Sequence, residues 1–105
     1  MSDIVNSTDQ VKVSVQFYST VKNTTGISHI DKTVPKKSLL RDLLIEIEKE
    51  LFLPKKAHFL KSDQTDVEPG IICLIDDADI HINGGLKQQI RKDAKVTLIS
   101  SLHGG

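Results

Sequence analysis

The chain has 105 residues, a length that fits one compact domain and leaves no room for a second. Fourteen basic residues balance fourteen acidic ones, so the sequence lacks the basic excess typical of proteins that bind nucleic acid directly. A single cysteine, Cys73, excludes an internal disulfide bond and indicates a reducing compartment.

The first ten residues, MSDIVNSTDQ, contain two aspartates, no basic residue and no apolar segment. They match neither a secretory signal nor a transit peptide, and we expect residues 1–10 to form a disordered tail. The longest apolar run, residues 71–75, is far too short to span a membrane. We therefore expect a protein of the cytosol or nucleus with no membrane contact.

The first regular element is a strand in which apolar and polar residues alternate. The apolar positions are Val11, Val13, Val15 and Phe17, which would share one buried face. A polar segment containing Gly26 then predicts a loop over residues 19–28. The next strand is expected over residues 29–34, with Ile30 and Val34 on one face. The two strands would form a hairpin.

A single long helix is predicted next, over residues 39–51. Pro35 interrupts strand pairing, and the Ser38 side chain is positioned to cap the helix. The apolar stripe consists of Leu40, Leu43, Leu44, Ile47 and Leu51. We expect Pro54 to end the helix, and the irregular pattern of residues 55–68 supports no assignment.

The second half of the chain predicts three further strands. Pro69 and Gly70 lead into residues 71–75, whose uninterrupted apolar run indicates an inner strand covered on both faces. A short partner strand is expected at residues 79–82, ended by a tight turn at Gly84 and Gly85. After a polar or helical turn, residues 96–102 alternate as the last strand.

The predicted order β-β-α-β-β-β indicates an α+β fold, a mixed sheet of about five strands with one main helix packed on one face. The β-grasp, or ubiquitin-like, arrangement has this order and places the first and last strands side by side in the middle of the sheet. We therefore divide the chain into a tail at 1–10, a β-grasp domain at 11–101 and a flexible arm at 102–105.

The arm carries the candidate reactive group. Gly104 and Gly105 follow the last predicted strand, where no turn requires glycine, and a glycine pair without β-carbons can pass through a narrow cleft. A terminal α-carboxylate, with a pKa of about 3.5, is ionised at neutral pH and can attack an activated phosphate to give an acyl-adenylate. We expect Gly105 to be the covalently modified residue, with Gly104, His103 and Leu102 contacting an activating enzyme.

The other candidate catalytic or metal-binding groups are expected to have structural roles. Alternation places Cys73 on the buried face of its strand, which predicts a core thiol. The four histidines, His29, His58, His81 and His103, lack metal-site spacing. Residues 76–79, DDAD, lack the glycine and distal glutamate of a calcium loop, so we expect a solvated turn. We predict a protein that is not an enzyme and binds no metal or cofactor.

The segments PGIICLIDDADI and VTLISSLHGG resemble the ubiquitin-related modifier family, whose relatives include the bacterial sulfur carriers for thiamine and molybdopterin. The resemblance covers residues 11–105. It implies that an activating enzyme with a rhodanese domain uses ATP and a sulfur donor to place a thiocarboxylate on Gly105. It also implies sulfur delivery to tRNA thiolation enzymes for 2-thiolation of the wobble uridine, conjugation to lysines of target proteins, and a monomer.

The chain departs from the family pattern at several positions. Family members usually have arginine where Glu68 stands, asparagine at Asp76 and tryptophan at Ile80. Ala94 replaces a glycine before the last strand, at a cost of about 1 kcal/mol if that turn needs a positive φ.

Two other functions fit the same features. The chain could be the small sulfur-carrier subunit of molybdopterin synthase, with its arm inserted into a large catalytic subunit. It could also be a non-reactive ubiquitin-fold module that binds partners through its sheet. The chain length and the SLHGG ending favour the modifier over the synthase subunit.

Overall fold

The computed structural model describes residues 9–100 of the chain. Its strands and helices, in chain order, are β1 (Gln10–Tyr18), α1 (Ser19–Thr25), β2 (His29–Pro35), β3 (Ser38–Leu39), α2 (Leu40–Ile47), β4 (Ile71–Ile75), β5 (Ala78–Asp79), β6 (Gln89–Ile90) and β7 (Ala94–Ser100). Most of the predicted tail lies outside the described residues.

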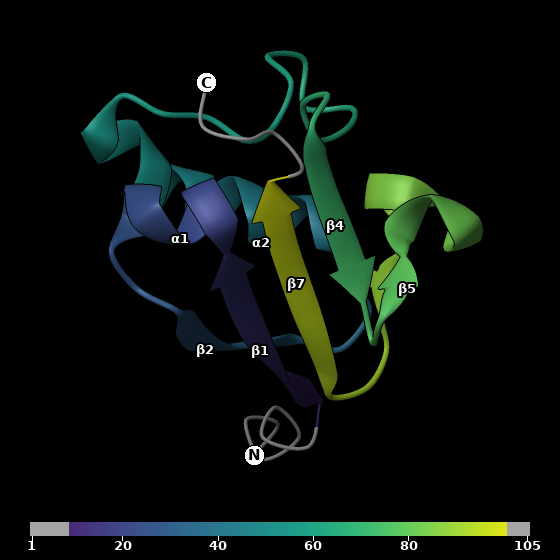
Figure 1. Ribbon diagram of the computed structural model, residues 1–105. Coiled ribbons are helices and arrows are strands. Elements are labelled where there is room, and N and C mark those ends of the chain that lie inside the picture. The colour runs from purple at the N-terminus through teal and green to yellow at the C-terminus, as the bar shows by residue number, and fades with distance from the viewer. Residues whose placement is uncertain (1–8, 101–105) are drawn as a thin grey trace.

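The main sheet has five strands in the order β2-β1-β7-β4-β5. β1 and β7 run parallel, with Val15 opposite Val96, whereas the other pairs are antiparallel. The last strand therefore lies in the middle of a mixed sheet, beside the first (Figure 1). This arrangement confirms the predicted β-grasp order.

α2 lies across one face of this sheet (Figure 1). Its apolar stripe packs into the core on that face. Leu40, Leu44 and Ile47 are fully buried because a spacing of three or four residues places them on one side of the helix. They join the inward-facing side chains Val13, Val15, Phe17, Val96 and Leu98 in one core.

The start of α2 differs from the prediction. Ser38 is not its cap: the Ser38 hydroxyl donates to the Pro35 carbonyl at 2.5 Å, and no side chain caps the helix. The Leu40 amide instead donates to the Gln88 carbonyl at 2.9 Å. This contact accompanies a second, two-stranded sheet of β3 and β6, which the sequence pattern did not indicate.

Helical structure is more extensive than predicted at two places. The expected loop after β1 contains α1, which buries Val21 and ends at Thr25, and Gly26 caps its C-terminus with a left-handed φ of 77°. α2 continues as a π-helical turn (Glu48–Phe52) and a 3-10 turn (Leu53–Lys55). Pro54 lies inside this last turn rather than ending the helix at residue 51, because an early position in a helical turn needs no amide donor.

The strand predicted at residues 79–82 is also wrong beyond its first residue. β5 ends at Asp79, whose side chain accepts a hydrogen bond from the His81 amide at 2.8 Å and starts a 3-10 turn (Ile80–Asn83). We call this segment the 80–83 turn. Gly84 and Gly85 have positive φ values of 104° and 63°, but they connect two 3-10 turns rather than two strands of a hairpin.

β4 is an inner strand of the sheet, as predicted, but only one of its faces is covered. Cys73 is buried on the face toward the core, whereas Ile72 on the opposite face is 37% exposed. The apolar run of β4 therefore reflects an apolar outer surface rather than a second covering layer.

Candidate functional site

The predicted site residues Leu102, His103, Gly104 and Gly105 lie outside the described residues. The structure does define Ser100, the last residue of β7 and the point from which this segment follows. Ser100 is buried and pairs with Ile71 of β4, and the preceding Ile99 pairs with Tyr18 of β1. The base of the arm is therefore fixed between two neighbouring strands.

Three apolar side chains lie side by side next to this base. Tyr18, Ile99 and Ile72 are direct neighbours across β1, β7 and β4. Their chain neighbours Phe17, Leu98 and Cys73 point into the core, so the three side chains occupy the outer face of the sheet. Tyr18 is 49% exposed. We call Tyr18, Ile72 and Ile99 the apolar row.

The apolar row is a surface feature that was not predicted from the sequence. One sequence signal could have identified it. Polar residues are expected at the strand positions that face solvent, but these three outward positions are apolar. Exposed apolar side chains grouped on one face mark interaction surfaces more often than isolated ones do. The row therefore extends the candidate site from the arm onto the folded domain.

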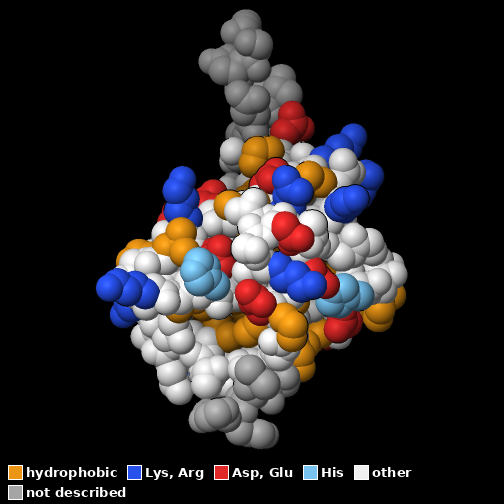
Figure 2. Space-filling view, turned by 90° about the horizontal axis from the view of Figure 1, so that it is seen from above, with side chains coloured by type: hydrophobic (Ala, Val, Ile, Leu, Met, Phe, Trp, Pro, Cys, Tyr) orange, Lys and Arg blue, Asp and Glu red, His pale blue; other side chains and the backbone are white. Residues whose placement is uncertain are grey.

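The charge around this end of the molecule is mixed. Figure 2 looks onto the end at which β7 finishes, and there Lys and Arg side chains intermingle with Asp and Glu. No single sign dominates this view, in agreement with the formal net charge of zero. This end of the molecule therefore presents no strong field of either sign.

Cys73 is confirmed as a core residue. Its side chain is 1% exposed and lies opposite Leu98 of β7. Burial raises the pKa of the Cys73 thiol to about 12, with a smaller contribution from the charges of Asp79 and Asp66. The thiol is thus protonated at neutral pH and unsuited to act as a nucleophile.

The DDAD segment is confirmed as a solvated turn. Asp76 and Asp77 have positive φ values of 49° and 69° and connect the paired residues Ile75 and Ala78. Asp76 Oδ1 accepts a hydrogen bond from the Lys95 amide at 2.9 Å. Within residues 9–100, no three metal-ligating side chains come together as a metal site.

Two of the departures from the family pattern, Ile80 and Ala94, have local explanations. Ile80, at the position usually occupied by tryptophan, is fully buried in the core and not available to a partner. Ala94 belongs to β7 and pairs with Val13. It is not among the residues with positive φ, so the conditional cost of about 1 kcal/mol does not arise.

A hollow of about 530 Å³ lies at the opposite end of β7. Its lining includes Ile75, Ile90, Arg91 and Ala94. Ala94 is the first residue of β7 and Ser100 the last, so this hollow lies away from Ser100, and its lining includes no residue of the apolar row. None of the described helices is long and apolar enough to cross a membrane.

Comparison with known proteins gives a family-level match over almost the whole chain. The model of the family described as Urm1 (Ubiquitin related modifier) matches residues 4–105. Ubiquitin-related modifier 1 of Homo sapiens is 42% identical over 66 residues, which cover 63% of either chain. Its homolog from Bombyx mori is 38% identical over 66 residues, covering 63% of this chain and 59% of that protein. The matched segment thus spans less than two thirds of these relatives.

Solved structures show the same fold at lower sequence identity. The solution structure of Urm1 from Trypanosoma brucei has a TM-score of 0.75 at 19% identity and covers 92% of this chain and 98% of that one. A Pyrococcus furiosus protein, described as a candidate subunit 1 of molybdopterin converting factor, has a TM-score of 0.62 at 16% identity, covering 88% of this chain and 99% of that one. Both likenesses concern the fold alone.

Proposed function

This chain belongs to the ubiquitin-related modifier (Urm1) family, and from that membership we propose that it is a sulfur carrier activated at its C-terminal glycine. The family is one of modifier proteins rather than enzymes. In this proposal Gly105 is adenylated and then thiocarboxylated by an activating enzyme. The sulfur serves 2-thiolation of the wobble uridine of tRNA, and the activated terminus also forms isopeptide bonds with lysines of target proteins.

The chemistry starts at the Gly105 carboxylate, in the form of the protein that ends there. One carboxylate oxygen attacks the α-phosphorus of ATP, the bond between the α- and β-phosphates breaks, and pyrophosphate leaves. The terminal sulfur of a persulfide donor then attacks the acyl carbon, and AMP leaves. A thiol cleaves the resulting acyl disulfide, which leaves the thiocarboxylate on Gly105 and a disulfide on the donor. Attack by a lysine amine instead expels AMP and gives an isopeptide bond.

Each part of the candidate site has a role in this proposal. Gly104 allows the arm to adopt whatever backbone angles a narrow cleft imposes, because it has no β-carbon. His103 and Leu102 contact the cleft walls. The apolar row receives the activating enzyme, since a protein that encloses the residues after Ser100 must also lie against the neighbouring sheet surface. ATP and the sulfur donor are bound by the enzymes and not by this chain, and we propose that the process takes place in the cytosol.

The position of β7 is the observation that supports this proposal most directly. β7 lies between β1 and β4, and its buried last residue, Ser100, is paired to β4 immediately before the sequence SLHGG. Because β7 is paired on both sides, the position of its last residue is fixed. The domain can therefore present the arm from a defined point.

The test uses intact mass and thiol alkylation of the native protein. After incubation with ATP, the activating enzyme and a persulfide donor, the mass should rise by one oxygen-for-sulfur exchange. Because the Cys73 thiol is buried and protonated, native alkylation should report the thiocarboxylate alone, and a Cys73→Ala variant should be labelled equally well. Deleting Gly105 should abolish both signals, and their persistence would reject the proposal.

The synthase-subunit alternative shares the activation chemistry but predicts a different partner. The observation behind this alternative is the fold likeness to the Pyrococcus furiosus protein. Under this alternative, the chain would co-purify in a stable complex with a large catalytic subunit, and its loss would stop molybdopterin synthesis. A modifier should instead be isolated without such a subunit, and its loss should reduce 2-thiouridine in tRNA.

A further inference from the structure

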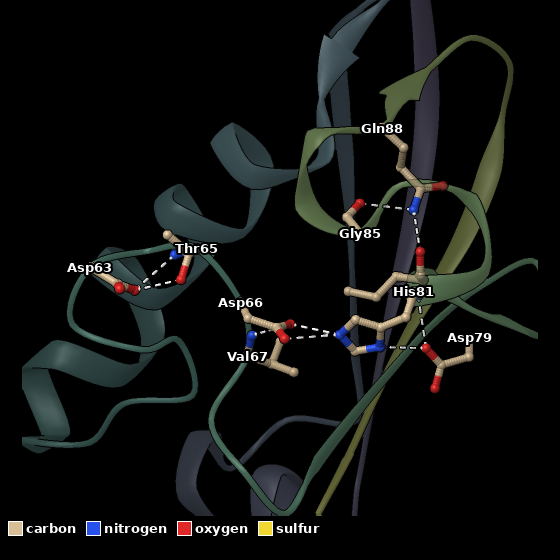
Figure 3. Close-up of polar contacts among 9 residues, drawn as sticks. Asp63, Thr65, Asp66, Val67, Asp79, His81, Gly85 and Gln88 are labelled. Atoms are coloured by element: carbon tan, nitrogen blue, oxygen red, sulfur yellow. Dashed lines mark hydrogen bonds and ion pairs between the residues drawn. The ribbon is translucent and has the colours of Figure 1, made fainter.

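An imidazole ring lies between two carboxylates that come from separate parts of the chain (Figure 3). His81 Nδ1 is 2.7 Å from Asp79 Oδ1, at the end of β5. On the other side of the ring, His81 Nε2 is 2.8 Å from Asp66 Oδ1 and 3.0 Å from Asp66 Oδ2. Asp66 belongs to the segment 61–67, which we call the 61–67 loop.

The protonation state of the ring determines whether both contacts can exist. A neutral imidazole has one N–H group, whereas an ionised carboxylate only accepts hydrogen bonds. Both ring nitrogens of His81 face carboxylate oxygens, so the arrangement is satisfied only by the imidazolium ion with two donors. In the neutral form, one ring nitrogen would direct a lone pair at a carboxylate.

We propose that His81 is a protonation-controlled clamp that ties the 61–67 loop to β5 and the 80–83 turn. In the protonated state the ring bridges the two segments. On deprotonation the ring retains its hydrogen bond to one carboxylate and loses its hydrogen bond to the other. The clamp involves none of the predicted arm residues and does not depend on their chemistry.

The two carboxylates are held in place independently of the ring. Asp66 Oδ1 also accepts a hydrogen bond from the Val67 amide at 2.7 Å, and Asp79 Oδ1 accepts one from the His81 amide at 2.8 Å. The base of the loop is closed by a bridge between Leu60 and Val67. Deprotonation should therefore free the ring from one carboxylate without unfolding either segment.

The contact with Asp66 is the one expected to open. Asp79 lies two residues from His81, so this contact closes a very short loop and stays close even when weakened. Asp66 lies 15 residues away in sequence, and its contact must order two separate segments. The 61–67 loop would thus lose its tie to the 80–83 turn, while the turn itself persists.

The charged surroundings favour the protonated ring. The groups facing it are Asp66 from the 61–67 loop and Asp79 from β5. The Cys73 thiol of β4, which lies within the influence of both carboxylates, is uncharged. The hydrogen bond to Asp66, followed by that to Asp79, raises the pKa of His81 above its ordinary value of 6.5.

The direction of the pH dependence follows from that shift. While both carboxyls are ionised, the clamp contributes fully to stability at pH values below the pKa that His81 has in the unfolded chain. This contribution is lost as pH rises through the higher pKa that His81 has in the folded protein. The His81 side chain is 52% exposed, so the effect should be local opening rather than global unfolding.

The experiment follows the ring nitrogens and the backbone amides of the full chain by NMR from pH 5 to pH 9. We expect both ring nitrogens of His81 to be protonated at pH 6.5, and the amides of Asp66, Val67 and His81 to shift with the same midpoint. Asp66→Asn should lower this midpoint. Asp63→Asn is the matched control, because Asp63 lies in the same loop and bonds to Thr65 rather than to His81.

Two results would overturn the proposal. One is a His81 ring that is mainly neutral at pH 6.5 in the native protein. The other is a midpoint that Asp66→Asn and Asp63→Asn change equally. If Asp66→Asn fails to fold, the titration of the wild-type protein is sufficient as a test. The proposal is then excluded if the amides of the 61–67 loop do not shift with the midpoint of His81.

Discussion

Cys73 shows how burial at a single residue controls reactivity. The side chain is 1% exposed, and burial raises the pKa of the thiol to about 12. We expect iodoacetamide to leave Cys73 unmodified in the native protein at pH 8 and to modify it completely in concentrated urea. Mass spectrometry of the two samples gives the answer, and rapid alkylation of the native protein would show that the thiol is accessible.

Glu48 is a second residue whose environment predicts a measurable effect. Its carboxylate is largely buried, and Oε2 accepts hydrogen bonds from the amides of Phe59 and Leu60, each at 2.9 Å. Glu48→Ala leaves two buried donors without this acceptor and should lower the free energy of unfolding by about 2–4 kcal/mol. Urea denaturation provides the measurement.

The control for this prediction is Glu46→Ala. Glu46 contacts Lys32 at 2.7 Å but is itself half exposed, so its removal should cost about 0–1 kcal/mol. Equal losses for the two variants would mean that the Glu48 carboxylate does not hold the backbone at residues 59 and 60.

At the scale of elements, the connection between β2 and β3 contains a strained residue. Lys37 has a left-handed φ of 73°. This conformation costs a non-glycine residue about 1–2 kcal/mol, whereas glycine adds an entropy cost of about 0.5–1 kcal/mol on folding. Lys37→Gly should therefore raise the free energy of unfolding by about 0.5 kcal/mol.

The neighbouring Lys36 supplies the matched control. It has no positive φ, so Lys36→Gly brings only the entropy cost and should destabilise the protein by about 0.5–1 kcal/mol. Thermal denaturation of both variants tests the pair. Two destabilised variants would show that Lys37 does not occupy the left-handed conformation in solution.

Elements with strong periodicity could be predicted from the sequence, and short ones could not. The alternation of Val11 to Phe17 and the stripe of α2 identified β1, the main helix and their buried faces. α1 was missed because Val21 is its only buried residue, which leaves no apolar stripe to recognise. The 80–83 turn was missed because the Asp79 cap outweighs the alternation of DIHI.

Only part of the candidate site could likewise be predicted from the sequence. The arm could be proposed from residue chemistry alone, since glycine and a carboxylate need no tertiary context to be recognised. The apolar row could not, because Tyr18, Ile72 and Ile99 are far apart in sequence and become neighbours only through strand register. The His81 clamp likewise depends on the folding of the 61–67 loop against β5.

For the whole molecule, an aromatic cluster connects the sheet to the segments that follow α2. Phe52 lies 6.2 Å from Phe17 and 4.7 Å from Phe59, measured between ring centroids. Because Phe52 is buried, Phe52→Ala should cost about 3–5 kcal/mol, a large part of the 5–15 kcal/mol typical of a domain. Chemical denaturation measures this loss, and a cost below about 1 kcal/mol would contradict a continuous core.

In the proposed function, the folded domain as a whole positions one terminal group. Its central strand fixes the base of the arm, the apolar row offers a surface beside that base, and its one thiol is enclosed. In the proposal, the folded domain takes no part in the chemistry, which takes place at Gly105 and in the enzymes that act on it.

The most direct test is the intact mass of the protein after incubation with ATP, its activating enzyme and a persulfide donor. The proposed function predicts a single oxygen-for-sulfur exchange, located on Gly105 by fragmentation and absent when Gly105 is deleted. An unchanged mass, or an exchange that survives the deletion, would contradict it.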